Sequence, residues 1–183
     1  MFDCFGVIST LVLPPWFKRN FGLEKGKELE VYYCSRGDRG EMSLKDIAHD
    51  LKVKYQFDED KIFNEWISTT KINEELISLI KELRKDNYVV LASNAAEGLV
   101  ENVFNFHNIH DLFDKVFISY KMKKVKPNFD FYQEIVSSFD VTFEKVVMVD
   151  DRLINLEHLP EIGVHPIQYK DMDLFKEEFD KIL

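Results

Sequence analysis

The stretch Val146-Val147-Met148-Val149-Asp150-Asp151 places two adjacent carboxylates directly after an apolar run. A continuous apolar run rich in valine is typical of a strand that is buried on both faces, as in a parallel sheet. Ligands of open α/β sheets bind beyond the carboxyl ends of the strands, where unpaired carboxylates are suitable metal ligands. The stretch therefore predicts a parallel α/β fold with a polar centre at one edge of its sheet.

The same alternation extends over residues 74–183. Short apolar strands are predicted at 88–92, 115–119, 146–149 and 164–168, with helices at 76–83, 97–107, 129–139, after Asp151, and at 171–183. Strands that alternate with helices of this length require parallel crossover connections. Residues 1–11 and 74–183 are therefore predicted to form a three-layer, Rossmann-like parallel sheet core.

Residues 12–73 have a different pattern, which is helical and charged. Ser43-Leu44-Lys45-Asp46 is a typical helix start, and Asp58 is suited to cap the following helix. The segment from Arg36 to Gly40 is predicted to be a turn between two helices. This region is expected to be an all-helical cap subdomain inserted into the core.

Asp3 is the only charged residue in the apolar start of the chain, Met1 to Ile8. Together with Asp150 and Asp151 it makes three carboxylates on apolar strands, which are costly to desolvate unless a cation compensates them. Only two residues precede Asp3, fewer than a buried strand normally has. Either that strand is very short, or it begins upstream of Met1.

Composition limits the class of protein. A chain of 183 residues with 45% hydrophobic residues can bury one core, with a smaller inserted subdomain. The net charge of −9 disfavours a general nucleic-acid or anionic-membrane binder. Two cysteines make no disulfide framework and indicate a cytoplasmic setting, and no apolar stretch reaches the length of a membrane span. The lysines at 121, 123, 124 and 126 form either a solvated face or a site for a small anion.

The strand ends carry complementary groups. Because loops after parallel strands share one rim, Asp3, Ser93, Lys126 and the Asp150-Asp151 pair are expected to converge. Carboxylates for a hard cation, a hydroxyl and an amide at a helix start, and one lysine would together receive a phosphate and Mg²⁺.

In these residues the chain resembles the haloacid dehalogenase superfamily, particularly phosphatase-like members with a helical cap. Asp3 to Ile8 is similar to the first motif, Ser93-Asn94 to the second, Lys126-Pro127 to the third, and Asp150-Asp151 with Asn155 to the fourth. The motifs occur in the right order, and a gap of about 90 residues separates the first two. Each motif alone is weak, but the ordered set is specific.

The resemblance implies a Mg²⁺-dependent hydrolase of small phosphomonoesters, such as a sugar phosphate or a nucleotide. It makes Asp3 the nucleophile that forms an aspartyl-phosphate, and it assigns the phosphate to Ser93, Asn94 and Lys126. The metal ligands it implies are Asp3, the backbone carbonyl of Phe5, Asp151, and Asp150 through water. The partner is then a small phosphorylated metabolite, bound by a monomer or a homodimer, with no nucleic acid and no membrane.

One position departs from the family pattern. Phosphatases of the superfamily usually carry a second aspartate two residues after the nucleophile, as general acid and base, and here that residue is Phe5. Loss of a positioned proton carrier typically costs about 10² to 10⁴ in rate. Three alternatives follow: a slow phosphatase, a phosphatase with an acid from the cap or the leaving group, or a silent phosphate-binding or regulatory domain.

Dehalogenases of the same superfamily have an aromatic residue at that position and need no metal, so a 2-haloacid dehalogenase is a further alternative. The Asp150-Asp151 pair disfavours it, because two close uncompensated carboxylates repel and raise each other's pKa. Simple structural roles also exist for single residues. Asp, Ser and Asn are common helix caps, and Lys126 alone would be an ordinary surface lysine.

Overall fold

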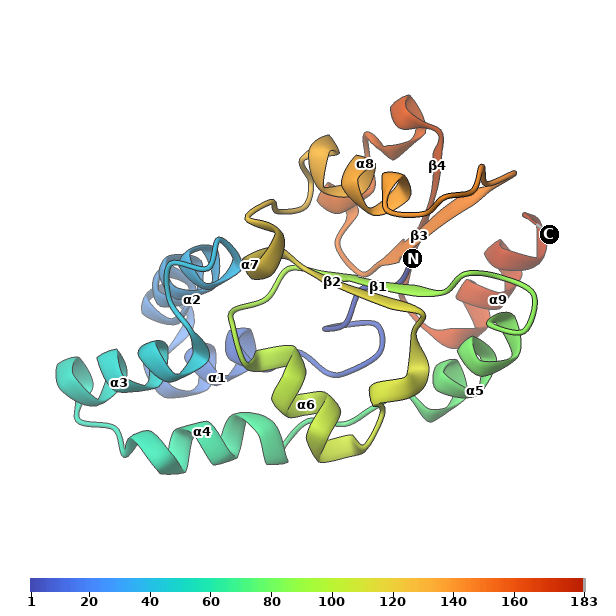
Figure 1. Cartoon of the computed structure of the whole chain (residues 1–183). Helices are drawn as coiled ribbons and strands as arrows, with labels where there is room; N and C mark the ends of the chain where they lie inside the picture. The colour runs from blue at the N-terminus through green and yellow to red at the C-terminus, as the bar shows by residue number, and fades with distance from the viewer. Residues whose placement is uncertain (183) are drawn as a thin grey trace.

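Residues 1–182 are described by a computed structural model of the chain, shown in Figure 1. The named strands are β1 (Val90–Ser93), β2 (Lys115–Ile118), β3 (Val146–Asp150) and β4 (Val164–Gln168). β1 pairs with β2 and β3 pairs with β4, and both pairs are parallel. The predicted parallel α/β architecture is confirmed.

The N-terminal segment joins the two strand pairs into one sheet. Phe2 forms parallel bridges to Leu91 of β1 and to Val149 of β3. Its N–H donates to Val90 O at 2.9 Å, its carbonyl accepts from Ala92 N at 2.8 Å, and the Asp3 N–H donates to Val149 O at 2.9 Å. The segment is therefore a very short central strand, in the spatial order β2, β1, Phe2, β3, β4.

Helices cover both faces of this sheet. Because side chains alternate across a strand, neighbouring residues of β1 enter different cores. Leu91 packs in one core with α5 (Glu74–Leu83), α6 (Leu99–His107) and α9 (Met172–Asp180), whereas Val90 and Ala92 pack in the other with α8 (Phe129–Ser137). Figure 1 shows α8 on the opposite side of the sheet from α6. The sheet is the middle of three layers.

Residues 13–68 form four helices, namely α1 (Leu13–Phe21), α2 (Leu23–Asp38), α3 (Leu44–Tyr55) and α4 (Glu59–Ser68). Ser43 and Asp46 make the predicted capping box at the start of α3, and the Asp58 side chain accepts from Lys61 N to cap α4. Trp16 lies edge-on to Trp66, with ring centroids 5.4 Å apart, in the aromatic core of these helices.

Two local predictions need correction. The turn predicted at 36–40 does separate two helices, but it begins later, because α2 continues to Asp38 and the connection to α3 runs over 39–43. The helix predicted after Asp151 is replaced by two 3₁₀ helices, η2 (Leu153–Asn155) and η3 (Leu159–Ile162). Pro160 lacks the N–H that an α-helix needs, and Gly163 ends η3 at a φ of 73°.

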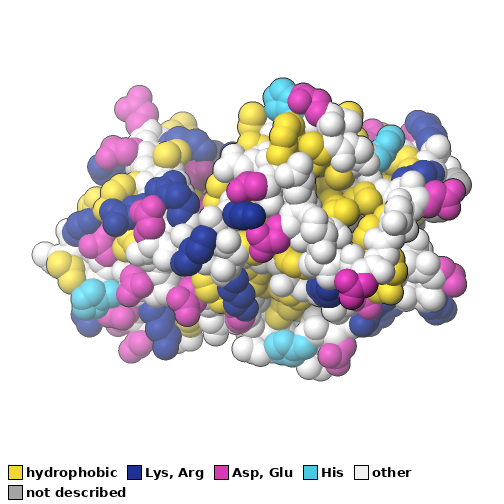
Figure 2. Space-filling view, turned by 45° about the horizontal axis from the view of Figure 1, so that its top comes forward, with side chains coloured by type: hydrophobic (Ala, Val, Ile, Leu, Met, Phe, Trp, Pro, Cys, Tyr) yellow, Lys and Arg dark blue, Asp and Glu magenta, His cyan; other side chains and the backbone are white. Residues whose placement is uncertain are grey.

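The structure also contains two short elements that the sequence did not predict, η1 (His110–Leu112) and α7 (Ser119–Met122). Among the helices of residues 1–182, none has both the length and the apolar content that crossing a bilayer requires. On the face shown in Figure 2, basic and acidic side chains are interspersed over the surface.

Candidate active site

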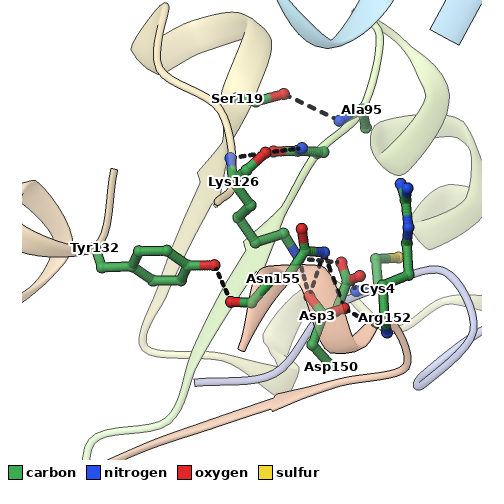
Figure 3. Close-up of polar contacts among 10 residues, drawn as sticks. Asp3, Cys4, Ala95, Ser119, Lys126, Tyr132, Asp150, Arg152 and Asn155 are labelled. Carbon is green, nitrogen blue, oxygen red and sulfur yellow. Dashed lines mark hydrogen bonds and ion pairs between the residues drawn. The ribbon is translucent and has the colours of Figure 1, made fainter. Parts of the chain in front are cut away.

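The predicted site residues meet at the carboxyl edge of the sheet. Asp3 follows the bridging residue Phe2, Ser93 ends β1, and Asp150 ends β3. Lys126 lies between α7 and α8 and reaches the same edge, as the close-up in Figure 3 shows. Parallel pairing is what aligns these strand ends, although the residues span most of the sequence.

Lys126 links two of the carboxylates. Its ammonium Nζ lies 3.0 Å from Asp3 Oδ1 and 2.5 Å from Asp150 Oδ2. The Lys126 side chain is fully buried, and Asp3 and Asp150 are also buried. One lysine between two carboxylates leaves a net negative charge out of water, which favours a further cation nearby.

Asp150 has all its oxygens engaged in hydrogen bonds. Oδ2 accepts from Lys126 Nζ, Oδ1 accepts from Arg152 N at 2.9 Å, and Asn155 Nδ2 lies 3.0 Å from each oxygen. The Asn155 carbonyl in turn accepts from the hydroxyl of Tyr132 at 2.7 Å. Asp150 therefore orients Lys126 and Asn155.

Asp151, unlike Asp150, has a carboxylate oxygen that accepts no hydrogen bond from residues 1–182. That oxygen, Oδ1, is buried. Gly6, at a φ of 89°, passes so close that an added Cβ would lie 2.5 Å from Asp151 Cγ. Asp3, Asp150 and Asp151 each offer a carboxylate oxygen within 4.8 Å of the others. The fold brings an unpaired carboxylate up to Asp3.

Ser93 and Asn94 differ in their contacts. Ser93 Oγ is buried beside Asp3, whose pKa it acts to lower, and it has no partner at full hydrogen-bond geometry in the described part of the chain. The Asn94 amide instead binds the backbone of Lys126, accepting from its N–H at 2.9 Å and donating to its carbonyl at 3.0 Å. Its contact is with the segment that carries the lysine.

The electrostatics of the cluster follow from burial. Burial raises the pKa of Asp3 to about 7, although Lys126 opposes the shift, and the Asp150 carboxylate adds to it. Burial alone would lower the pKa of Lys126, but Asp3 and Asp150 together raise it above its ordinary value. Burial, followed by the neighbouring charge of Asp150, raises the pKa of Asp151. Ionisation of Asp3 and Asp151 is therefore disfavoured unless a further cation compensates their charge.

These residues fit a hard divalent cation. Asp3 and Asp151 present carboxylate oxygens within 4.8 Å of each other, and the Phe5 carbonyl accepts no hydrogen bond from any residue in 1–182. Oxygen donors of this kind are what Mg²⁺ prefers. Because the oxygens of Asp150 are already engaged, its contribution to such a site would pass through water or through its charge.

A pocket lies over the cluster, lined by Asp3, Phe5, Asn94, Lys126 and Asp151 and, from the helical region, by Glu30, Cys34 and Asp38. Sequence reasoning missed these last three residues. They lie inside α2, and the helix has no strand end or motif to mark them.

The lysine run does not form an anion site. Lys121 pairs with Glu101 at 2.8 Å and Lys124 with Glu134 at 2.7 Å. Lys123 lies 3.4 Å from the Gly40 carbonyl, and only Lys126 enters the buried cluster. The predicted alternative of a solvated face describes the other three lysines.

A three-layer parallel sheet with a buried lysine and several carboxylates at its carboxyl edge places the chain among α/β proteins whose ligand site lies at that edge. Within that class the chain belongs to the haloacid dehalogenase-like hydrolases, because the model of that family matches residues 11–163.

Individual relatives are distant. A sesquiterpene phosphatase of Aspergillus oryzae, astK, is 24% identical over 138 residues, which are 73% of this chain and 70% of that protein. A predicted HAD-like family hydrolase from Porphyromonas gingivalis has the same fold, with a TM-score of 0.76 and 19% identity over 99% of this chain and 95% of its own. A HAD family enzyme from Bacteroides thetaiotaomicron, solved with magnesium and inorganic phosphate, gives a TM-score of 0.75 and 19% identity over 92% of both chains.

Proposed function

We propose that this hydrolase is a Mg²⁺-dependent phosphatase of small phosphomonoesters, with Asp3 as its nucleophile. The observation that carries the proposal is the cluster of buried Asp3, Asp150 and Lys126 with the partly exposed Asp151, beside a pocket. The magnesium and phosphate bound by the Bacteroides enzyme and the phosphatase name of the Aspergillus relative support it.

In the proposed reaction, an Asp3 carboxylate oxygen attacks phosphorus and the bond to the leaving oxygen breaks. Water then attacks the aspartyl-phosphate, releasing phosphate and restoring Asp3. Ser93 Oγ would donate to the phosphoryl oxygens, and Lys126 would neutralise charge on both Asp3 and the phosphate. When bound by Asp3, Asp151 and the Phe5 carbonyl, Mg²⁺ would withdraw charge from the phosphoryl group.

The helical residues 12–73 would then form a cap over this pocket. Glu30, Cys34 and Asp38 of α2 line it from that side. A cap that closes over the substrate excludes water from the reacting groups.

Chemistry of the site disfavours metal-independent dehalogenation. Asp151 has a buried carboxylate oxygen without a partner in residues 1–182, close to Asp150 and Asp3. Without a cation these charges would repel and hinder ionisation of the nucleophile.

The experiment is hydrolysis of 4-nitrophenyl phosphate with Mg²⁺ and with EDTA. Turnover is expected only with Mg²⁺, and Asp3→Asn is expected to abolish it. The matched control is Asp86→Asn, which changes an exposed aspartate in the turn before β1 and should leave the rate unchanged. Phosphate binding without turnover in the wild-type protein would support the silent-domain alternative, and chloride release from a 2-chloroacid would support a dehalogenase.

A further inference from the structure

We propose that Asp38, at the C-terminal end of α2, is the general acid and base of this reaction, in place of the aspartate that Phe5 replaces. This inference rests on the proposed phosphatase function and adds a catalytic residue to it. Two observations support it. Asp38 lines the same pocket as Asp3, and its carboxylate has no hydrogen-bond or ion-pair partner within residues 1–182.

Asp38 faces the same pocket as the nucleophile. Asp3, Phe5, Lys126 and Asp38 all line it, although Asp38 comes from the helical region and the other three from the sheet edge. A phenyl ring at Phe5 carries no exchangeable proton, so the sheet side of the pocket lacks a proton carrier at that position. Asp38 supplies a carboxyl group to the same pocket from the helical region.

Close packing holds the end of α2 at this place. A Cβ on Gly37 would lie 2.7 Å from Ala96 Cβ, so α2 approaches the loop that follows Ser93 and Asn94 at a distance only glycine permits. The Leu44 N–H donates to the Glu97 carbonyl at 2.8 Å, which ties the start of α3 to the same loop. Asp38 is therefore fixed relative to the residues proposed to bind phosphate.

The Asp38 carboxylate is not used elsewhere in the structure. Within residues 1–182 it makes no hydrogen bond and no ion pair, while its neighbour Arg39 pairs with Glu41 at 2.6 Å. Glu30, another carboxylate in the pocket wall, is paired with Lys27 at 2.8 Å. A half-buried carboxyl group without a partner is free to exchange a proton with a substrate.

The surroundings of Asp38 also keep a fraction of its carboxyl groups protonated near neutral pH. Burial raises its pKa to about 6, and the positive charges of Lys126, Arg152 and Arg39 oppose the shift. The other ionisable groups that line the pocket are Asp3, Glu30, Cys34 and Asp151. A carboxyl group with this pKa can donate a proton in one step and accept it in the next.

Asp38 gives up a proton in the first step and regains one in the second. In the first, Asp3 oxygen bonds to phosphorus, the bond to the ester oxygen breaks, and that oxygen takes the proton of Asp38. In the second, the Asp38 carboxylate takes a proton from water as the water oxygen bonds to phosphorus and Asp3 departs. Asp38 ends as it began, protonated.

The test compares 4-nitrophenyl phosphate with phenyl phosphate, which has nearly the same shape but a leaving group that needs a proton far more. With Mg²⁺ present, kcat/KM reports the steps up to formation of the aspartyl-phosphate. Asp38→Asn is expected to lower kcat/KM for phenyl phosphate by about 10²-fold or more and for 4-nitrophenyl phosphate by much less. It should also produce a burst of 4-nitrophenolate, because water attack on the intermediate loses its base.

Control variants separate this role from a structural one. Glu41→Gln changes an exposed carboxylate on the same segment, outside the pocket, and should keep the wild-type ratio between the substrates. Asp38→Glu should recover part of the activity with phenyl phosphate. In the Asp38→Asn background, Phe5→Asp should raise turnover of phenyl phosphate, since it returns a proton carrier from the sheet side.

An equal loss on both substrates, or no loss, would overturn the role of Asp38 while leaving the phosphatase proposal intact. A wild-type protein that hydrolyses neither ester would overturn both. Circular dichroism of each variant establishes that the comparison is made between folded proteins.

Discussion

Asp150 and Asp151 are neighbours in sequence, yet their carboxylates have opposite surroundings. Asp150 accepts four hydrogen bonds from Lys126, Arg152 and Asn155, whereas Asp151 has a buried oxygen without a partner in residues 1–182. A strand presents successive side chains to opposite sides, so adjacent residues at its end meet different groups. One carboxylate organises the site, and the other is open to a cation.

This difference gives a paired prediction at the residue scale. Asp151→Asn is expected to raise the Mg²⁺ concentration for half-maximal activity by at least about tenfold, with little change in the free energy of unfolding. Asp150→Asn is expected to cost about 3–5 kcal/mol of that free energy, because it breaks a buried, charge-assisted network. Mg²⁺ titrations and urea unfolding in EDTA measure the two effects. The interpretation is wrong if the two variants exchange their phenotypes.

At the scale of elements, α2 determines what faces the sheet edge. Gly37 lets the last turn of this helix approach Ala96, and Asp38 follows directly. Figure 1 shows the end of α2 beside α7, at the same edge. A glycine in a helix is normally a cost, so its presence here reflects the close contact.

The substitution Gly37→Ala tests that contact by the sign of the change in the free energy of unfolding. Helix propensity alone predicts a gain of roughly 0.5–1 kcal/mol in the free energy of unfolding. The contact predicts a loss of about 1–3 kcal/mol, because the new methyl group would overlap Ala96 Cβ, which cannot move aside. We expect the steric loss to exceed the gain from helix propensity, so that Gly37→Ala is less stable than the wild type and hydrolyses phenyl phosphate more slowly.

The matched control is Ser35→Ala, on the same helix, which removes an exposed hydroxyl that donates a long hydrogen bond to Tyr32 O at 3.4 Å. It should change the free energy of unfolding by no more than about 0.5 kcal/mol. A more stable Gly37→Ala protein with wild-type activity would mean that the helix end is not held as described.

At the scale of the whole molecule, the site closes a long loop of chain. Asp3 comes from the N-terminal segment and Asp151 from the segment after β3, so a cation shared by them binds the folded chain only. Binding to the folded state raises its stability by mass action. Mg²⁺ at a hundred times its dissociation constant is expected to add about 2.7 kcal/mol to the free energy of unfolding.

Thermal unfolding with Mg²⁺, with EDTA, and with NaCl at matched ionic strength measures this coupling. The melting temperature should rise only with Mg²⁺, and the rise should disappear in Asp151→Asn. A rise of equal size in that variant, or in NaCl, would show that the ion acts through general screening and not at the cluster.

Much of this molecule followed from short-range patterns. The apolar runs before Ser93 and Asp150 predicted parallel strands, and Ser43 and Asp58 predicted their helix starts, because strand burial and helix capping depend on neighbours in sequence. The convergence of Asp3, Lys126 and the aspartate pair was also predictable, since all parallel strands point the same way.

Tertiary structure alone decided the rest. The division of labour between Asp150 and Asp151, the use of the Asn94 amide to hold Lys126, and the entry of Asp38 into the pocket depend on contacts between segments far apart in the chain. So does the 3₁₀ path after Asp151, where Asn155 bonds to Asp150. Sequence patterns report which face of an element is apolar, whereas the partner of a polar side chain is set by how those elements pack.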